Sequence, residues 1–304
     1  MQNDLIQRIK NITLKALVSD DYLLENLTLK GGNALDMIYR LNKRGSKDLD
    51  FSLQEDFSEN FEDIKKRVYK TLYTTFIEEG FVVIDYKFLD KPANISSDLE
   101  SFWGGYDIEF KIVSQDSYDK NNGVQDDNLR RKAISFADNG SPKIEIDISK
   151  YEYVGERIKH DFDGLIVYVY APVLILFEKV RAICQQTNEY GEIVKRDRAS
   201  GRSRDFYDIY SIMEHDASID IYTEENQQII SRVFEAKRVP LDFIKLIPSY
   251  KGIHEDNFLS LQATIGRVDK LESFEFYYQY VTSRMDKLLE LIIKNSSDNK
   301  DAIL

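Results

Sequence analysis

The sequence predicts an α+β protein, in which strands and helices share residues 1–170 and helices alone form residues 171–304. The first observation is a set of short runs that alternate in polarity or are rich in β-branched and aromatic residues, as strands are. These runs lie at residues 48–53, 81–89, 106–113, 143–149 and 164–170. The second observation is that apolar residues recur at helical spacing from Pro172 onwards. We therefore expect two domains, residues 1–170 and residues 171–304.

Helices are predicted before, between and after these strands. Residues 4–24 carry apolar side chains at mixed helical spacing, which predicts one or two helices ahead of the first strand. Residues 60–79 form an amphipathic pattern, and Gly80 is placed to end that helix. Further helices are predicted from Pro172, over residues 204–213 and within residues 223–304. The last of them has an apolar stripe made of Phe274, Tyr278, Val281, Met285, Leu288 and Ile292.

Composition and charge exclude several classes of protein. A net charge of −12 argues against a surface that wraps nucleic acid nonspecifically. The single cysteine, Cys184, cannot form an internal disulfide and indicates a reducing compartment. The longest apolar run, residues 165–177, is interrupted by Pro172 and is too short to span a bilayer. The first ten residues lack a secretion signal. We expect a cytoplasmic protein without a membrane partner.

Residues 29–53 hold the strongest chemical signal. Gly31 and Gly32 precede a helical patch, and the strand that follows places Asp48 and Asp50 on one face and its apolar residues on the other. Two neighbouring carboxylates repel each other, and a Mg²⁺ ion relieves this repulsion while leaving positions open for substrate phosphates. Glycines let backbone N–H groups approach a phosphate closely, and the following helix adds its positive end. This stretch is therefore a candidate metal and phosphate site.

The same stretch resembles the nucleotidyltransferase superfamily signature, a GG or GS pair followed by two acids that alternate with apolar residues. The longer pattern is K-G-G-x-A-L from Lys30 and R-x-S-x-D-L-D-F from Arg44. It is similar to the AbiEii, AbiGii and MenT toxins of bacterial abortive-infection and toxin–antitoxin systems. One departure is Asn33, where the family usually has a small hydroxyl residue. The resemblance implies a polymerase-β-like mixed sheet with flanking helices, followed by a helical domain that completes the cleft.

A third acid on a strand completes the metal site in proteins of this superfamily. Residues 143–149 alternate strictly, so Glu145 and Asp147 share one face of the predicted strand. Asp147 is our choice for the third ligand and Glu145 is the alternative. A strand with an acidic outer face and no metal role is the remaining interpretation.

The helical half contributes further candidates. Lys179 lies at the edge of an apolar stripe, where a lysine either extends to water or reaches into the site. Asp205 falls in the middle of the apolar face of residues 204–213, so its carboxylate needs a buried partner, such as Lys179 or a substrate group. Asp208 lies at the edge of that face, four residues from Arg204, with which it can pair. The patterns E-K-V-R-A and R-x-R-D-F-Y-D-I-Y also resemble downstream motifs of AbiEii-type toxins.

The segment Lys195–Arg204 reads KRDRASGRSR and is strongly basic on an acidic protein. Such a run is ordinarily a solvated loop. Its alternative role is to bind NTP phosphates or an RNA backbone. His160, His215 and His254 have neither metal-ligand spacing nor a nearby nucleophile motif, and no chemistry is assigned to them.

Together with the resemblance, these residues imply a nucleotidyltransferase that transfers NMP from an NTP to an acceptor hydroxyl and releases pyrophosphate. Two Mg²⁺ ions would bind Asp48 and Asp50, and Asp147 would bind the catalytic ion. The catalytic set is completed by Lys179 and Asp205. The predicted nucleotide-binding residues are Lys30, Gly31, Gly32, Arg44, Ser46, Lys179, Arg204 and Asp208. The implied role is a toxin with a separately encoded antitoxin and with tRNA 3′ ends, or another RNA, as candidate acceptor.

Two other functions fit the same residues. The first is a small-molecule nucleotidyltransferase, such as one that modifies an antibiotic, because an acidic protein favours a cationic acceptor. The second is a catalytically silent NTP-binding module that acts through protein contacts. The sequence identifies neither the preferred nucleotide nor the acceptor.

Overall fold

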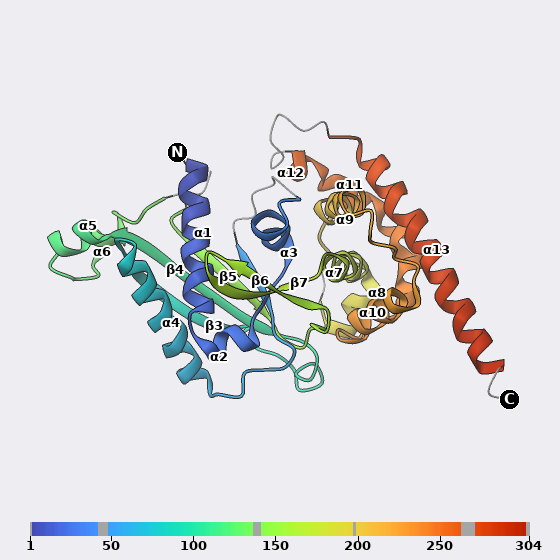
Figure 1. Ribbon diagram of the computed structural model, residues 1–304, viewed down its shortest axis with the longest axis horizontal. Coiled ribbons are helices and arrows are strands. Elements are labelled where there is room, and N and C mark those ends of the chain that lie inside the picture. Colours follow the sequence, from blue (N-terminus) through green and yellow to red (C-terminus); the bar gives the residue numbers. More distant parts are fainter. Residues whose placement is uncertain (1, 42–47, 136–140, 197–198, 263–270, 302–304) are drawn as a thin grey trace. The chain divides into compact units, whose positions relative to one another are not determined.

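The computed structural model describes residues 2–41, 48–135, 141–196, 199–262 and 271–301. The chain forms two compact units (Figure 1). The sheet unit consists of Met1–Asn33 and Ser46–Val169, and the helical unit consists of Ala34–Gly45 and Tyr170–Leu304. The predicted α+β class is confirmed. The segment Ala34–Gly45, which lies in sequence between two strands of the sheet, groups with the helical unit.

The described residues of the sheet unit form a mixed sheet of seven strands in the order β3-β4-β5-β2-β1-β7-β6. The pairs β3/β4, β4/β5 and β1/β2 are antiparallel, whereas β2/β5 and β1/β7 are parallel. The two strands with the predicted acids, β2 and β5, are therefore direct neighbours. The strands are β1 (Thr28–Leu29), β2 (Leu49–Ser52), β3 (Phe81–Lys91), β4 (Gly105–Ser114), β5 (Ile144–Ser149), β6 (Arg157–Phe162) and β7 (Leu165–Tyr170).

All five predicted strands are present among the described residues, and the short strand β1 and the strand β6 are additional. The more informative of the two is β6. Its sequence, RIKHDF, mixes charged and apolar residues, and none of its residues is fully buried. The strand lies at the edge of the sheet, where polar side chains discourage further pairing. Sequence patterning misses such a strand because it has no buried face.

Helices pack against one face of the sheet. The long helix α4 (Phe61–Glu78) lies beside α1 (Gln2–Val18) and against β3 and β4 (Figure 1). The ring of Phe76 meets Phe110 edge-on, with 5.5 Å between ring centroids, so the apolar face of β4 points towards α4. Gly80, with φ +82°, follows Glu79, the C-cap residue of α4, in the position predicted for the residue that ends this helix. The shorter helices of this unit are α2 (Asp21–Asn26), α3 (Gly31–Asn33), α5 (Gln115–Lys120) and α6 (Asp127–Arg130).

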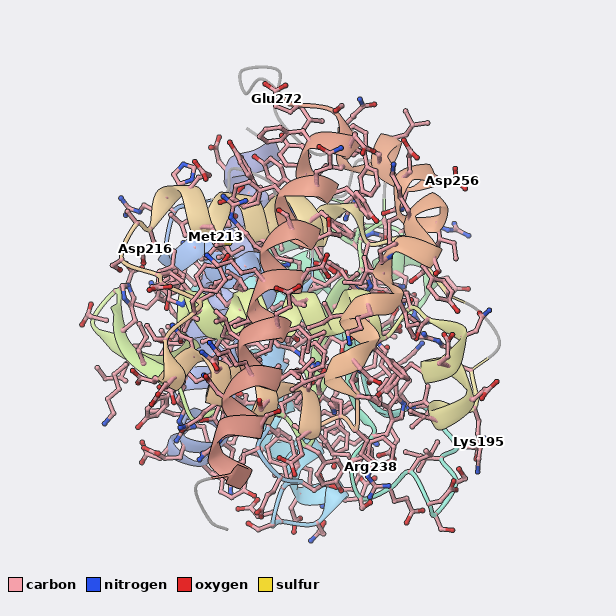
Figure 2. All side chains as sticks on the ribbon, turned by 90° about the vertical axis from the view of Figure 1, so that its right-hand side faces the viewer. Lys195, Met213, Asp216, Arg238, Asp256 and Glu272 are labelled. Carbon is pink, nitrogen blue, oxygen red and sulfur yellow. The ribbon has the colours of Figure 1, made fainter. Side chains whose placement is uncertain are left out.

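The helical unit is built around α7 (Pro172–Cys184), which is buried on nearly every side. Helices α9 (Ser203–His215), α10 (Glu224–Glu235) and η2 (Leu241–Tyr250) pack on it. The long helix α13 (Phe274–Asp301) packs on α9 and η2 and crosses the face shown in Figure 2, near Met213 and Asp216 at the end of α9. The remaining helical segments are η1 (Ala34–Ile38), α8 (Asn188–Val194), α11 (Lys251–Asp256) and α12 (Phe258–Gln262).

The structure bears on the expectations for the single cysteine and for membrane-spanning segments. Cys184 is a buried, free thiol. Over the described parts of the chain, no helix combines the length and the apolar character that a bilayer-spanning segment requires.

Candidate active site

The glycine pair follows β1 and lies against β2. The N–H of Lys30 donates to the carbonyl of Asp50 at 2.9 Å, which fixes the start of the turn on the neighbouring strand. Gly31 has φ +67°, in the left-handed region that costs other residues about 1–2 kcal/mol. A Cβ at this position would lie 3.0 Å from Oδ2 of Asp50. The turn comes this close to the Asp50 carboxylate because residue 31 is glycine.

Asn33 ties the glycine turn to the same strand. Its Nδ2 donates a hydrogen bond to the carbonyl of Asp48, and its side chain is fully buried. Its Oδ1 is also buried and has no hydrogen-bond partner among the described residues. The departure from the family pattern at position 33 thus introduces an amide that anchors the backbone of the first predicted acid.

The parallel register of β2 and β5 brings the predicted acids onto one face of the sheet. Asp50 lies opposite Asp147, and Leu49 lies opposite Ile146. Extending this register by one residue places Asp48 opposite Glu145. Burial, the charge of Glu145 and a hydrogen bond with it, and then the charge of Asp147 raise the pKa of Asp48 above its ordinary value. The charges of Glu145 and Asp147 therefore act on Asp48.

Lysines hold the two acids of β5. Nζ of Lys91 binds Oδ2 of Asp147, and Nζ of Lys143 lies 2.9 Å from Oε1 of Glu145. In the part of the chain that the structure describes, no three His, Cys, Asp or Glu side chains are grouped so as to hold a metal ion. The register thus places Asp147 beside Asp50, while its carboxylate is engaged by Lys91. The choice between Asp147 and Glu145 as third ligand stays open.

The acidic face extends to β4, which sequence reasoning missed. Asp107 lies opposite Asp147, and Glu109 lies opposite Glu145, in the antiparallel pair β4/β5. Burial raises the pKa of Asp107, and the charge of Lys91 opposes this shift. Burial alone would lower the pKa of Lys91, but its hydrogen bond to Asp147 and the charges around it raise the pKa. The alternation of β4 was visible in the sequence, but its register with β5 was not.

The other phosphate-binding predictions in the sheet unit have mixed outcomes. Lys30 is buried, with its Nζ 3.2 Å from Oγ of Ser149 and 3.6 Å from Oε1 of the buried Glu152. Its charge therefore stabilises Glu152, and a phosphate contact stays a prediction. Gly32 is buried in the short helix α3. Arg44 and Ser46 lie outside the described residues.

Lys179, Asp205 and Asp208 form a buried cluster within the helical unit. Nζ of Lys179 lies 2.9 Å from Oδ1 of Asp205 and 2.7 Å from Oδ2 of Asp208. The three side chains are 7%, 11% and 0% exposed, respectively. The predicted pairing of Asp205 with Lys179 is confirmed, and the alternative in which this lysine extends to water is wrong. Asp208 is the most buried of the three, although the helical projection placed it at the edge of the apolar face.

Part of the predicted basic loop has structural contacts. Arg196 donates to the carbonyl of Gln185, and Nη1 of Arg202 lies 3.8 Å from Oδ2 of Asp205. Arg204 is half-buried on α9. Residues 197–198 lie outside the described residues, so a substrate role for the loop stays a prediction.

His254, to which no chemistry was assigned, supports the start of α9. Its Nδ1 accepts a hydrogen bond from the N–H of Arg202 at 3.1 Å, and the side chain is fully buried. Burial lowers the pKa of His254 from 6.5 to about 4, with the charge of Arg202 in the same direction and that of Asp205 opposed. The folded protein therefore keeps this imidazole neutral.

We expect this histidine to make the protein less stable in mild acid. Between pH 6.5 and pH 4 the unfolded chain binds a proton on His254 that the folded chain does not, so stability falls as the pH falls through this window. The contribution between pH 7 and pH 5 is about 2 kcal/mol. Urea unfolding at both pH values, with wild type and His254→Asn, measures it. A wild-type loss no larger than that of the variant would contradict this assignment.

The glycine turn gives a second prediction. Gly31→Ala forces a Cβ into the left-handed region and against the Asp50 carboxylate, so we expect nucleotide transfer to fall by about tenfold or more. Gly80→Ala is the matched control, because Gly80 also has a positive φ but a Cβ there meets no atom within 4 Å. Steady-state transfer rates of both variants are compared with wild type. Equal losses would show that backbone strain alone, and not the contact with Asp50, is responsible.

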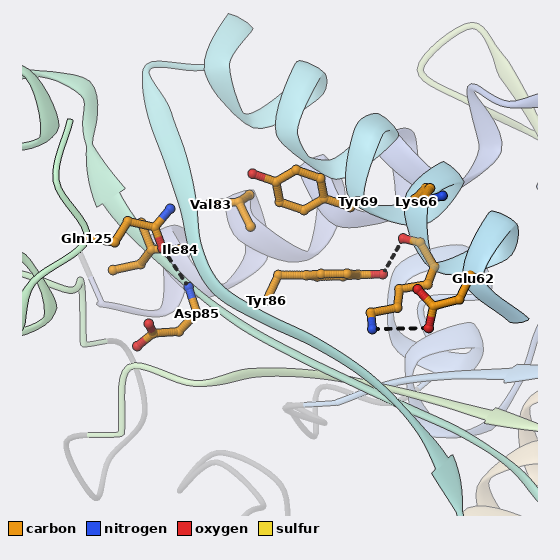
Figure 3. Close-up of a pocket in the computed structure, with 9 residues that line it drawn as sticks. Glu62, Lys66, Tyr69, Val83, Ile84, Asp85, Tyr86 and Gln125 are labelled. Carbon is orange, nitrogen blue, oxygen red and sulfur yellow. Dashed lines mark hydrogen bonds and ion pairs between the residues drawn. The ribbon is translucent and has the colours of Figure 1, made fainter.

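The structure also contains a pocket of about 380 Å³ between α4 and β3 (Figure 3). Tyr69 and Tyr86 line it, and the Tyr86 hydroxyl donates to the carbonyl of Lys65 at 2.9 Å. It lies on the helix-covered side of the sheet. The acids of β2 and β5 alternate with the apolar residues that face this side and therefore point the other way. None of the predicted site residues lines the pocket.

Comparison with known protein families bears on the alternative functions. The family described as nucleotidyl transferase AbiEii toxin, type IV toxin–antitoxin system, matches residues 12–279. The chain belongs to the AbiEii nucleotidyltransferase toxin family. This AbiEii protein is therefore a nucleotidyltransferase, and its family implies an NTP substrate and a separate antitoxin. No protein of curated function matches the sequence.

Several solved structures are similar to this AbiEii protein at low identity. JHP933 from Helicobacter pylori is 17% identical, with a TM-score of 0.46 and coverage of 98% of this chain and 96% of that chain. MenT4, a nucleotidyltransferase toxin from Mycobacterium tuberculosis H37Rv, is 13% identical, with a TM-score of 0.39 and coverage of 96% and 84%. An antigenic nucleotidyltransferase-like protein from Paracoccidioides brasiliensis is 14% identical, with a TM-score of 0.37 and coverage of 86% and 94%. These TM-scores are below 0.5, so the family assignment rests on the family match.

Proposed function

We propose that this toxin is a Mg²⁺-dependent enzyme that transfers NMP from an NTP to a hydroxyl of cellular RNA, with the 3′ end of tRNA as the first candidate. The observation that carries the proposal is the position of Asp50, which lies opposite Asp147 on the parallel neighbour strand and against Gly31 of the turn. Carboxylates beside a glycine turn are the combination that metal-bound phosphates require.

The residues present fit a divalent cation by their chemistry. The donors are carboxylate oxygens on two adjacent strands, which Mg²⁺ prefers over nitrogen and sulfur. A lysine ammonium binds one of them, and this contact with a positive charge supports the proposal. Asp48 and Asp50 would hold two Mg²⁺ ions, and Asp147, or Glu145 in its place, would share the catalytic ion. When bound, the ions would neutralise the phosphate charge that develops during transfer.

The chain's own residues would bind and orient the substrates. Gly31 and Gly32 would present backbone N–H groups to the phosphates. Lys179 would contribute charge to the triphosphate, with Asp205 and Asp208 fixing its ammonium. Positioning the acceptor hydroxyl in line with the leaving pyrophosphate would supply most of the rate, since phosphoryl and nucleotidyl transfer depend on alignment and on charge neutralisation. Lys30, Arg44, Ser46 and Arg204 are further candidates for phosphate contacts.

The test measures transfer of label from each of four α-labelled NTPs. Total cellular RNA and aminoglycosides are offered as acceptors in separate reactions. We expect labelled RNA from at least one NTP in the presence of Mg²⁺, and none in excess EDTA. Label from γ-labelled NTP would show transfer of the terminal phosphate and contradict the proposed reaction. Label on the aminoglycosides alone would replace the RNA acceptor by a small cationic one, and no label on any acceptor would favour a silent NTP-binding module.

A further inference from the structure

Lys91 lies at the end of β3, beside the acidic face that β2, β5 and β4 form. Its Nζ binds Oδ2 of Asp147, and the charges of Asp107 and Asp50 also act on it. The side chain is 53% exposed, and a lysine ammonium is carried on a flexible four-carbon stem. Sequence patterning did not single out this residue.

Two other lysines on this face differ from Lys91 in what they bind. Lys87, four residues earlier on the same strand, lies 3.5 Å from Glu109. Lys143 binds both Glu109 and Glu145. Lys91 binds the acid that is in register with Asp50. A metal ion shared by the acids of β2 and β5 would therefore bind the same carboxylate of Asp147 that this ammonium binds.

An ammonium and a Mg²⁺ ion cannot both bind the same carboxylate oxygen along the same direction, and each lowers the affinity of the oxygen for the other. We propose that Lys91 is a resident cation that competes with the divalent metal for Asp147 and is displaced when the metal binds. This inference rests on the proposed function, because it takes Asp147 as a ligand of the catalytic ion. It makes Lys91 a positioning residue, which holds the Asp147 carboxylate at the site and sets its affinity for the metal.

The first test measures metal binding without substrate. Mn²⁺ is titrated into wild type, Lys91→Met and Lys87→Met, and free Mn²⁺ is followed by its electron paramagnetic resonance signal. Lys91→Met should bind Mn²⁺ about three- to tenfold more tightly, because the competing charge is gone. Lys87→Met is the matched control, because it removes an equal charge from the same strand, and this charge pairs with Glu109 and not with Asp147. Its affinity should stay close to that of wild type.

The second test follows the lysine itself. Wild type is treated briefly with an amine-reactive reagent with and without Mn²⁺, and modification of Lys91 and Lys87 is quantified by mass spectrometry. Displacement from Asp147 should increase the modification of Lys91 severalfold on Mn²⁺ addition and leave Lys87 unchanged.

The outcomes separate this inference from the proposed function. If wild type binds Mn²⁺ but Lys91→Met binds it equally or more weakly, or if Lys91 reactivity does not change, the resident-cation role is wrong and the metal site stands. If wild type binds no Mn²⁺ at millimolar concentration, the proposed metal site itself is wrong.

Discussion

Asp50→Asn should abolish nucleotide transfer, with a loss of about a thousandfold or more in rate. Asp50 is the acid that lies against the glycine turn and opposite Asp147, so the substitution removes the charge at the point where both parts of the proposed site meet. The side chain is half-buried, and replacing one acid in a group of acids relieves repulsion. The variant should therefore fold at least as well as wild type.

The rate is measured with the α-labelled NTP that wild type prefers, and folding is checked by thermal unfolding. Glu109→Gln is the matched control, because Glu109 belongs to the same acidic face but pairs with Lys87 and Lys143 and lies opposite Glu145, not Asp147. It should keep transfer within about threefold of wild type. Transfer by Asp50→Asn at more than a tenth of the wild-type rate would contradict the role of this acid.

The second large effect concerns stability. Lys179→Met removes the ammonium that holds Asp205 and Asp208 inside the helical unit. Breaking a buried ion pair by removing one partner costs about 3–5 kcal/mol, because a buried carboxylate is left without its counter-charge. We expect the free energy of unfolding of the helical unit to fall by that amount, as measured by urea denaturation followed by circular dichroism.

A second variant distinguishes lost charge compensation from lost packing. Lys179→Met combined with Asp208→Asn removes the most buried carboxylate charge together with its partner, so this variant should recover at least about 1 kcal/mol of the loss. If the double variant is less stable than Lys179→Met, packing around α7 and not the ion pair accounts for the effect. A single-variant loss below about 1 kcal/mol would show that the cluster is not a buried charge network.

The local elements and the acidic strand faces could be predicted from sequence because they depend on periodicity. The alternation of residues 48–53 and 143–149 correctly placed Asp50 and Asp147 on polar faces of strands. The inward position of Asp205 on α9 correctly predicted a buried cationic partner. In each case the spacing of apolar and polar residues within one helix or strand was enough to predict which way the side chain points.

What depends on register between distant elements could not be predicted. The pairing of Lys91 with Asp147 joins residues 56 positions apart and requires the strand order β3-β4-β5, which no local pattern contains. The burial of Asp208 was missed because a helical projection shows one helix and not the neighbours on both of its sides. The edge strand β6 was missed because its side chains lack a buried face.

In the proposed site, an acid of β5 acts together with the acids of β2 to bind the metal. Single-turnover transfer by Asp147→Asn, with Glu145→Gln alongside it, tests this most directly. We expect the rate of Asp147→Asn to fall to the level of Asp50→Asn, whereas Glu145→Gln should keep most of the wild-type rate. The reverse result would make Glu145 the third ligand, and wild-type rates for both variants would contradict the proposed site.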